Sequence, residues 1–116
     1  MTTAHDIIRL IETRRLPLTS EKRLQAALAE EFAGAGIAAE REVDLGYGDI
    51  IDFMIGPIGL ELKIRGQRRA IFRQCERYCG HERVGTLILA TNAAMGLPAR
   101  IGDKPVHVVS LARGWL

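Results

Sequence analysis

Residues 49–64 read DIIDFMIGPIGLELKI, two short apolar runs on either side of a Gly-Pro pair. Runs of this length that are rich in Ile, Leu, Phe and Met are typical of buried strands, and Gly56-Pro57 is a turn signal. The stretch therefore predicts a β-hairpin with strands at residues 49–55 and 58–64.

Three charged residues, Asp52, Glu61 and Lys63, interrupt this apolar hairpin. Side chains two apart in a strand share a face, so Glu61 and Lys63 point the same way. In an antiparallel hairpin with an even loop, opposed residues have numbers that add to an odd sum, which places Asp52 on that face too. An odd loop or a bulge would exchange Asp52 for Asp49, the alternative ligand.

The three charged groups indicate a metal site, because burying each of them unpaired would cost several kcal/mol. The carboxylates of Asp52 and Glu61 and the carbonyl of Leu62 are hard oxygen ligands of the kind that Mg²⁺ accepts, with Mn²⁺ as a substitute. Lys63 could help to deprotonate a metal-bound water or neutralise charge on a phosphorane. We therefore expect phosphodiester hydrolysis, with an exposed cross-strand salt bridge as the alternative interpretation of the E-x-K triplet.

The hairpin lies within one predicted α/β domain that spans residues 1–116. Apolar periodicity predicts helices at residues 3–15, 19–33 and 66–79 and further strands at residues 39–45, 84–91 and 106–111. The strand-helix-strand step that follows the hairpin favours a right-handed crossover and a parallel strand pair. The expected fold is a mixed sheet of about five strands flanked by helices.

Charge is unevenly distributed along the chain. Residues 21–52 contain eight acidic and three basic residues, whereas residues 61–83 contain seven basic and three acidic ones. The basic segment includes a candidate phosphate-binding set, of which the last three members recur every four residues of the predicted helix: Arg65, Arg68, Arg69, Arg73 and Arg77. An ordinary solvated helix face is the alternative.

The order of helix, three-strand meander carrying D-x8-E-x-K, helix and strand over about residues 19–111 resembles the PD-(D/E)XK nuclease superfamily. That superfamily includes restriction endonucleases, archaeal Holliday junction resolvases and small phage nucleases. Ile51 stands where the usual proline precedes the aspartate. The resemblance implies a restriction-endonuclease-like fold and a Mg²⁺-dependent endodeoxyribonuclease in which Asp52, Glu61 and Lys63 are catalytic.

Two further family features match residues of this chain. Glu21 corresponds to an acidic residue at the start of the helix before the meander, where it helps to hold the metal or its water. Gln74 and Tyr78 resemble a Q-x-x-x-Y element in which the glutamine orients the site and DNA, so both join the expected site and nucleic-acid surface. The alternatives are a first-turn acid favoured by the helix dipole for Glu21, and a solvated Gln74 beside a packed Tyr78.

A domain of this size has no room for a separate specificity module, so DNA structure rather than sequence is the expected target. Resemblance to resolvases suggests a branched junction, flap or nick as the substrate, a role in DNA recombination, and a homodimer. Two alternatives stay open, a noncatalytic nucleic-acid-binding or regulatory module on the same fold and a small structural or protein-interaction domain.

Composition also bears on location and on other metals. No apolar run approaches the roughly 18 residues of a membrane helix, and no secretion signal is recognisable, so we expect a cytoplasmic protein without a membrane partner. Cys75, Cys79 and His81 offer only three ligands for zinc without the paired C-x-x-C spacing. Small buried thiols that pack a helix are the default interpretation.

Overall fold

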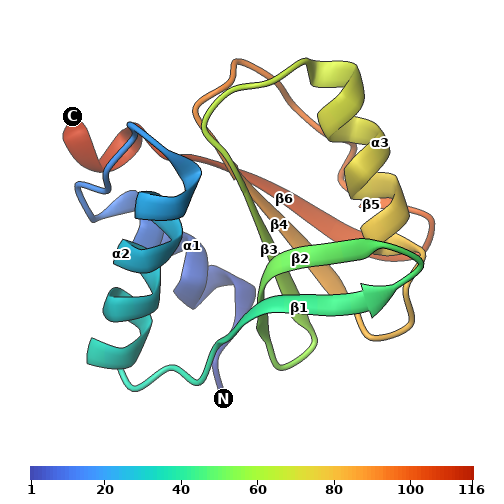
Figure 1. Cartoon of the computed structure of the whole chain (residues 1–116), viewed down its shortest axis with the longest axis horizontal. Helices are drawn as coiled ribbons and strands as arrows, with labels where there is room; N and C mark the ends of the chain where they lie inside the picture. The colour runs from blue at the N-terminus through green and yellow to red at the C-terminus, as the bar shows by residue number, and fades with distance from the viewer.

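The computed structural model describes residues 1–116 as a six-stranded mixed sheet with helices on both faces (Figure 1). Along the chain the elements are α1 (Ala4–Glu12), α2 (Glu21–Gly34), β1 (Glu40–Gly46), β2 (Asp49–Ile55), β3 (Ile58–Lys63), α3 (Arg68–Cys79), β4 (Thr86–Thr91), β5 (Arg100–Ile101), β6 (Lys104–Ser110) and a short 3₁₀ helix (Arg113–Trp115). The predicted mixed α/β sheet is confirmed at this level.

The strands follow the order β1-β2-β3-β4-β6-β5. β1, β2 and β3 form an antiparallel meander, β3, β4 and β6 run parallel, and β5 pairs antiparallel with β6. The count is six strands rather than about five, because the two-residue strand β5 folds back onto the start of β6. The carboxyl ends of three parallel strands therefore lie next to one another at one edge of the sheet.

Local sequence signals determine where the helices begin. Thr3 begins α1 with a capping box that includes Asp6, and the side chain of Ser20 accepts a hydrogen bond from the backbone N–H of Arg23 at the start of α2. α3 begins at Arg68, two residues later than predicted, because Gly66 has a φ of +150° that a helix does not accommodate. None of the helices has the length and apolar character needed to cross a membrane.

The core consists of two apolar clusters, one on each face of the sheet. The larger cluster joins α1 and α2 to the sheet and contains Leu60 and Leu62 of β3. The smaller cluster joins α3 to the opposite face and contains Leu89 of β4 and Val106 of β6. Because side chains alternate along a strand, Glu61 of β3 belongs to the α3 face.

Candidate active site between strands β2 and β3

The two strands of the hairpin part at Asp52 and Glu61. Their paired residues run from Ile55 opposite Ile58 to Phe53 opposite Leu60, and the pairing ends there. Beyond it the backbone N–H of Asp52 donates to Oε1 of Glu61 at 3.3 Å, and the N–H of Leu62 donates to Oδ2 of Asp52 at 2.8 Å. Each carboxylate thus takes the place of a backbone carbonyl and holds the opposite strand.

The register agrees with an even loop, but side-chain alternation does not continue through Asp52. Ile51 and Met54 both pack in the cluster beside α3, whereas Phe53 packs in the other cluster, so the phase shifts between residues 51 and 53. Glu42 on the paired strand β1 has a φ of +50°, which marks the same irregularity. The carboxylate of Asp52 therefore reaches Glu61 through the opening between the strands and not by standing on a common face.

Glu61 is the buried member of the pair, with 3% of its surface exposed. Burial raises the pKa of Glu61 to about 8, and the charge of Asp52 acts in the same direction. The ammonium group of Lys63, whose Nζ lies 3.5 Å from Oε2 of Glu61, opposes this rise. One lysine therefore does not compensate the two neighbouring carboxylates.

Helix α2 contacts the site through two side chains one turn apart. Oε2 of Glu21 accepts a hydrogen bond from the backbone N–H of Ile64 at 3.3 Å, just past the end of β3. Gln25 donates through Nε2 to Oδ1 of Asp52 at 3.1 Å, and its Oε1 accepts from Nε and Nη2 of Arg41 at 3.3 and 2.9 Å. Glu21 thus lies beside the strand that carries Lys63, and Gln25 fixes the second oxygen of Asp52.

Sequence reasoning assigned no role to Gln25 or Arg41. The available signal was the position of Gln25 on the buried side of α2, where a polar side chain needs a partner. Arg41 gave no such signal, because it looks like an ordinary exposed residue of an edge strand. Together with Asp52 they form a three-residue chain across α2, β1 and β2.

Helix α3 supports the site from the other face. Gln74 donates through Nε2 to the hydroxyl of Tyr78 at 2.8 Å, and that hydroxyl donates to the carbonyl of Ile50 at 2.9 Å. Burial and then the charge of Glu61 raise the pKa of Tyr78, which keeps its hydroxyl protonated. Because Tyr78 is fully buried, it offers no surface to nucleic acid, and Gln74 contacts Tyr78 instead of the carboxylates.

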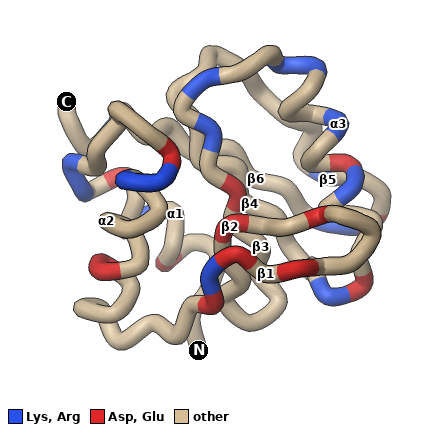
Figure 2. Tube along the Cα trace, in the orientation of Figure 1, with Lys and Arg blue, Asp and Glu red and all other residues tan.

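The predicted arginine set divides into free and paired members. Four of the five are exposed and form no side-chain hydrogen bond or ion pair: Arg65, Arg68, Arg69 and Arg73. Figure 2 shows the basic positions along the β3–α3 connection and α3, beside the acidic positions where β2 meets β3. The free arginines therefore follow the carboxylate pair along the chain, from the β3–α3 connection into α3.

Asp49, the alternative ligand, is the first residue of β2, three residues before Asp52. Its carboxylate accepts from Nε of Arg77 at 3.0 Å and lies 2.8 Å from Nε2 of His81. The hydrogen bond with His81 is the main cause that lowers the pKa of Asp49, and Arg77 adds to it. Asp49 is therefore engaged near the end of α3 and does not replace Asp52.

The described structure contains no cluster of three or more His, Cys, Asp or Glu side chains arranged to hold a metal ion. Cys75 and Cys79 are buried against the sheet, and His81 is turned toward Asp49. A cation at Asp52 and Glu61 would thus have two carboxylates and would complete its coordination with backbone, water or substrate oxygens.

The site has to be interpreted from its own residues, because no family model, curated protein or solved structure matches the chain. Its residues provide two adjacent carboxylates, a lysine within reach of one of them, and a row of unpaired arginines. This combination can bind a cation and a phosphate side by side.

Proposed function

We propose that this protein is a metal-dependent endodeoxyribonuclease that hydrolyses phosphodiester bonds at Asp52, Glu61 and Lys63. The observation that supports this proposal is that the carboxylates of Asp52 and Glu61 bridge the parted strands, while Nζ of Lys63 lies 3.5 Å from Oε2 of Glu61. A hairpin closed by its ordinary backbone ladder would need neither carboxylate. Membership of the PD-(D/E)XK nucleases, which the sequence resembles, is part of this proposal.

The donor set fits Mg²⁺, with Mn²⁺ as a substitute. The raised pKa of Glu61 indicates a site short of positive charge, which a divalent ion would supply. Asp52, Glu61 and the carbonyl of Leu62 would hold the ion, and Mg²⁺ is commonly bound by one or two carboxylates together with water and substrate phosphates. When bound, the ion would activate a water molecule and neutralise charge on the phosphate.

The residues of the chain would bind the phosphate and orient the groups that contact it and the ion. Lys63 would donate to a phosphate oxygen, and its own carbonyl is fixed by Oγ1 of Thr91 at 2.6 Å and by the N–H of Asn92 at 3.2 Å. Gln25 and the N–H of Leu62 hold both oxygens of Asp52. The carboxylate of Asp52 and the backbone of Lys63 are thus held by partners that do not themselves react.

DNA would bind along the free arginines Arg65, Arg68, Arg69 and Arg73. Arginines without acidic partners favour phosphate contacts, which are sensitive to salt and tolerant of sequence. A branched or otherwise structured DNA as the target, and a homodimer that presents two sites, are the finer parts of this proposal and derive from the resemblance to resolvases.

A noncatalytic nucleic-acid-binding or regulatory module is the second candidate. It is favoured by the same unpaired arginines together with the lack of a third acidic or histidine ligand around Asp52 and Glu61. Such a module would retain DNA and would not cleave it under any cation.

Cleavage assays separate the two candidates. Linear, flapped and four-way DNA would be incubated with the protein, with and without Mg²⁺ or Mn²⁺. We expect cation-dependent cleavage that falls by at least about a hundredfold in Lys63→Ala while DNA affinity stays within a few fold. Glu30→Gln, an exposed carboxylate of α2, is the control and should cleave normally. Retention of DNA without cleavage of any substrate would refute the nuclease in favour of the binding module.

A further inference from the structure

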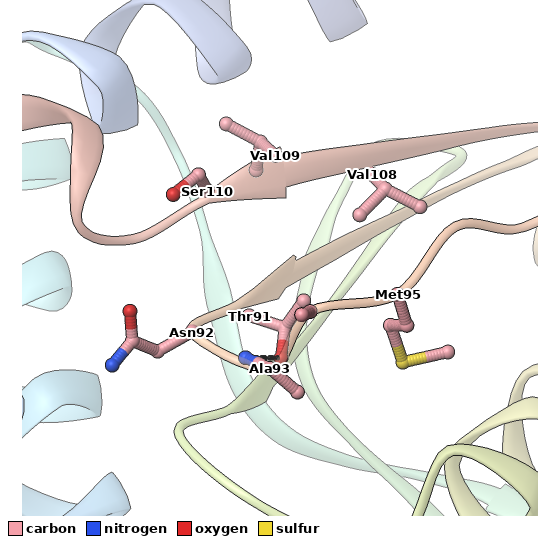
Figure 3. Close-up of a pocket in the computed structure, with 8 residues that line it drawn as sticks. Thr91, Asn92, Ala93, Met95, Val108, Val109 and Ser110 are labelled. Atoms are coloured by element: carbon pink, nitrogen blue, oxygen red, sulfur yellow. Dashed lines mark hydrogen bonds between the residues drawn. The ribbon is translucent and has the colours of Figure 1, made fainter.

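An open pocket of about 440 Å³ lies at the carboxyl ends of β4 and β6, next to the proposed site (Figure 3). The strand ends and the loop after β4 line it: Thr91, Asn92, Ala93, Ala94, Met95, Val108, Val109 and Ser110. Thr91 and Asn92 fix the carbonyl of Lys63, but the proposed chemistry does not use the other lining residues or the hollow itself, so the pocket needs an explanation of its own.

Strand register places this pocket beside Lys63. Lys63 pairs with Thr91 of β4, and Thr91 pairs with Ser110 of β6, so the three residues lie side by side on adjacent parallel strands. All three belong to the α3 face, which Glu61 shares. One to two strand spacings, about 5–10 Å, separate the backbone of Lys63 from the pocket.

The lining combines apolar walls with a few unused polar groups. Val108 is 37% exposed although it is aliphatic, and it faces the loop that carries Ala93 and Met95 (Figure 3). The side chains of Asn92 and Ser110 have no hydrogen-bond partner within the protein, whereas the hydroxyl of Thr91 is bound to the carbonyl of Lys63. No charged residue lines the pocket. A neutral, partly apolar hollow with polar groups at its rim suits a planar heteroaromatic ring.

We infer that this pocket receives an unpaired base of the nucleotide next to the phosphate at Lys63, an inference that rests on the proposed function. A DNA strand whose phosphate contacts Lys63 and Arg65 would place the neighbouring base within reach of β4 and β6. A base held in a duplex is stacked and paired and does not enter such a pocket, whereas a base in a flap, a fork or a single strand does. The substrate class is therefore DNA with unpaired nucleotides at the cleavage position.

The first test uses the unmodified protein. Single-stranded oligonucleotides carry the fluorescent base 2-aminopurine at one position each, and they are bound in EDTA so that no cleavage occurs. We expect a fluorescence change confined to one or two adjacent positions. An equal response at every position would overturn the inference.

The second test fills the pocket. Val108→Trp should weaken both the fluorescence response and the cleavage of flapped DNA about tenfold. Ala38→Trp is the control, because Ala38 is exposed before β1, at the opposite end of the sheet. If flapped and fully paired DNA are cleaved equally and Val108→Trp changes neither, the pocket inference fails while the nuclease stands. If the position-specific response is present but nothing is cleaved, the pocket stands and the nuclease fails.

Discussion

Replacing Glu61 with Gln should stabilise the protein in the absence of divalent cations. The buried carboxyl group of Glu61 lies beside Asp52 and has only Lys63 as a counter-charge. Glutamine has the same shape, carries no charge and can donate to Asp52 as the protonated glutamic acid does. The substitution therefore removes an electrostatic penalty while the packing is kept.

The size and sign follow from the pKa of Glu61, which is raised from 4.5 to about 8. Between these values the unfolded chain has released a proton that the folded protein still holds, so the free energy of unfolding falls as the pH rises. Each pH unit corresponds to about 1.4 kcal/mol, so the penalty is roughly 3 kcal/mol at pH 7. Below pH 4.5 both states are protonated and the penalty vanishes, and above about pH 8 it no longer grows.

Urea unfolding followed by circular dichroism, in EDTA from about pH 5 to about pH 8, measures this difference. The free energy of unfolding of Glu61→Gln minus that of the wild type should grow with pH over this range. Glu30→Gln, on the exposed side of α2, should follow the wild type. Parallel curves for wild type and Glu61→Gln would refute the reasoning, because they would mean that Glu61 titrates alike in both states.

Three further outcomes are expected. Gln25→Ala removes a hydrogen-bond donor from Asp52. Cleavage should fall by about 10- to 100-fold, and the Mg²⁺ concentration that gives the half-maximal rate should rise, because a misoriented ligand binds the ion less well. Replacing Arg69 and Arg73 together with Gln should reduce the slope of log Kd against log salt by about two, measured by DNA-binding titration. Asp49→Asn should leave cleavage unchanged but cost about 1–2 kcal/mol in urea unfolding near neutral pH, and the cost should fade as the pH falls through the lowered pKa of Asp49.

Short-range signals in the sequence were enough to predict the hairpin. The predicted strands at residues 49–55 and 58–64 match Asp49–Ile55 and Ile58–Lys63, because the turn pair and the two apolar runs act within a few residues. The strand Arg100–Ile101 was missed, since two residues show no periodicity and its pairing depends on the turn that follows. Local signals thus define long elements and leave short ones undetermined.

The geometry at Asp52 could not be predicted in the same way. Parity brought Asp52 and Glu61 together, but it assumed regular alternation, which fails between Ile51 and Phe53. The shift coincides with the positive φ of Glu42 on the paired strand β1, and residues 51–53 carry no local sequence signal for it. The same limit applies to Gln25 and Arg41, whose contact joins residues sixteen positions apart.

The parting of β2 and β3 weighs against a purely structural role for the charged residues. An exposed salt bridge between Glu61 and Lys63 would leave the hairpin ladder intact and the pKa of Glu61 near its usual value. Instead the backbone ladder stops, the N–H of Asp52 donates to the carboxylate of Glu61, and burial raises the pKa of Glu61. A hairpin whose backbone hydrogen bonds stop before its strands end loses stability. Such departures from regular structure are concentrated at functional sites. The proposed cation between Asp52 and Glu61 would offset this cost, because it would neutralise the two carboxylates.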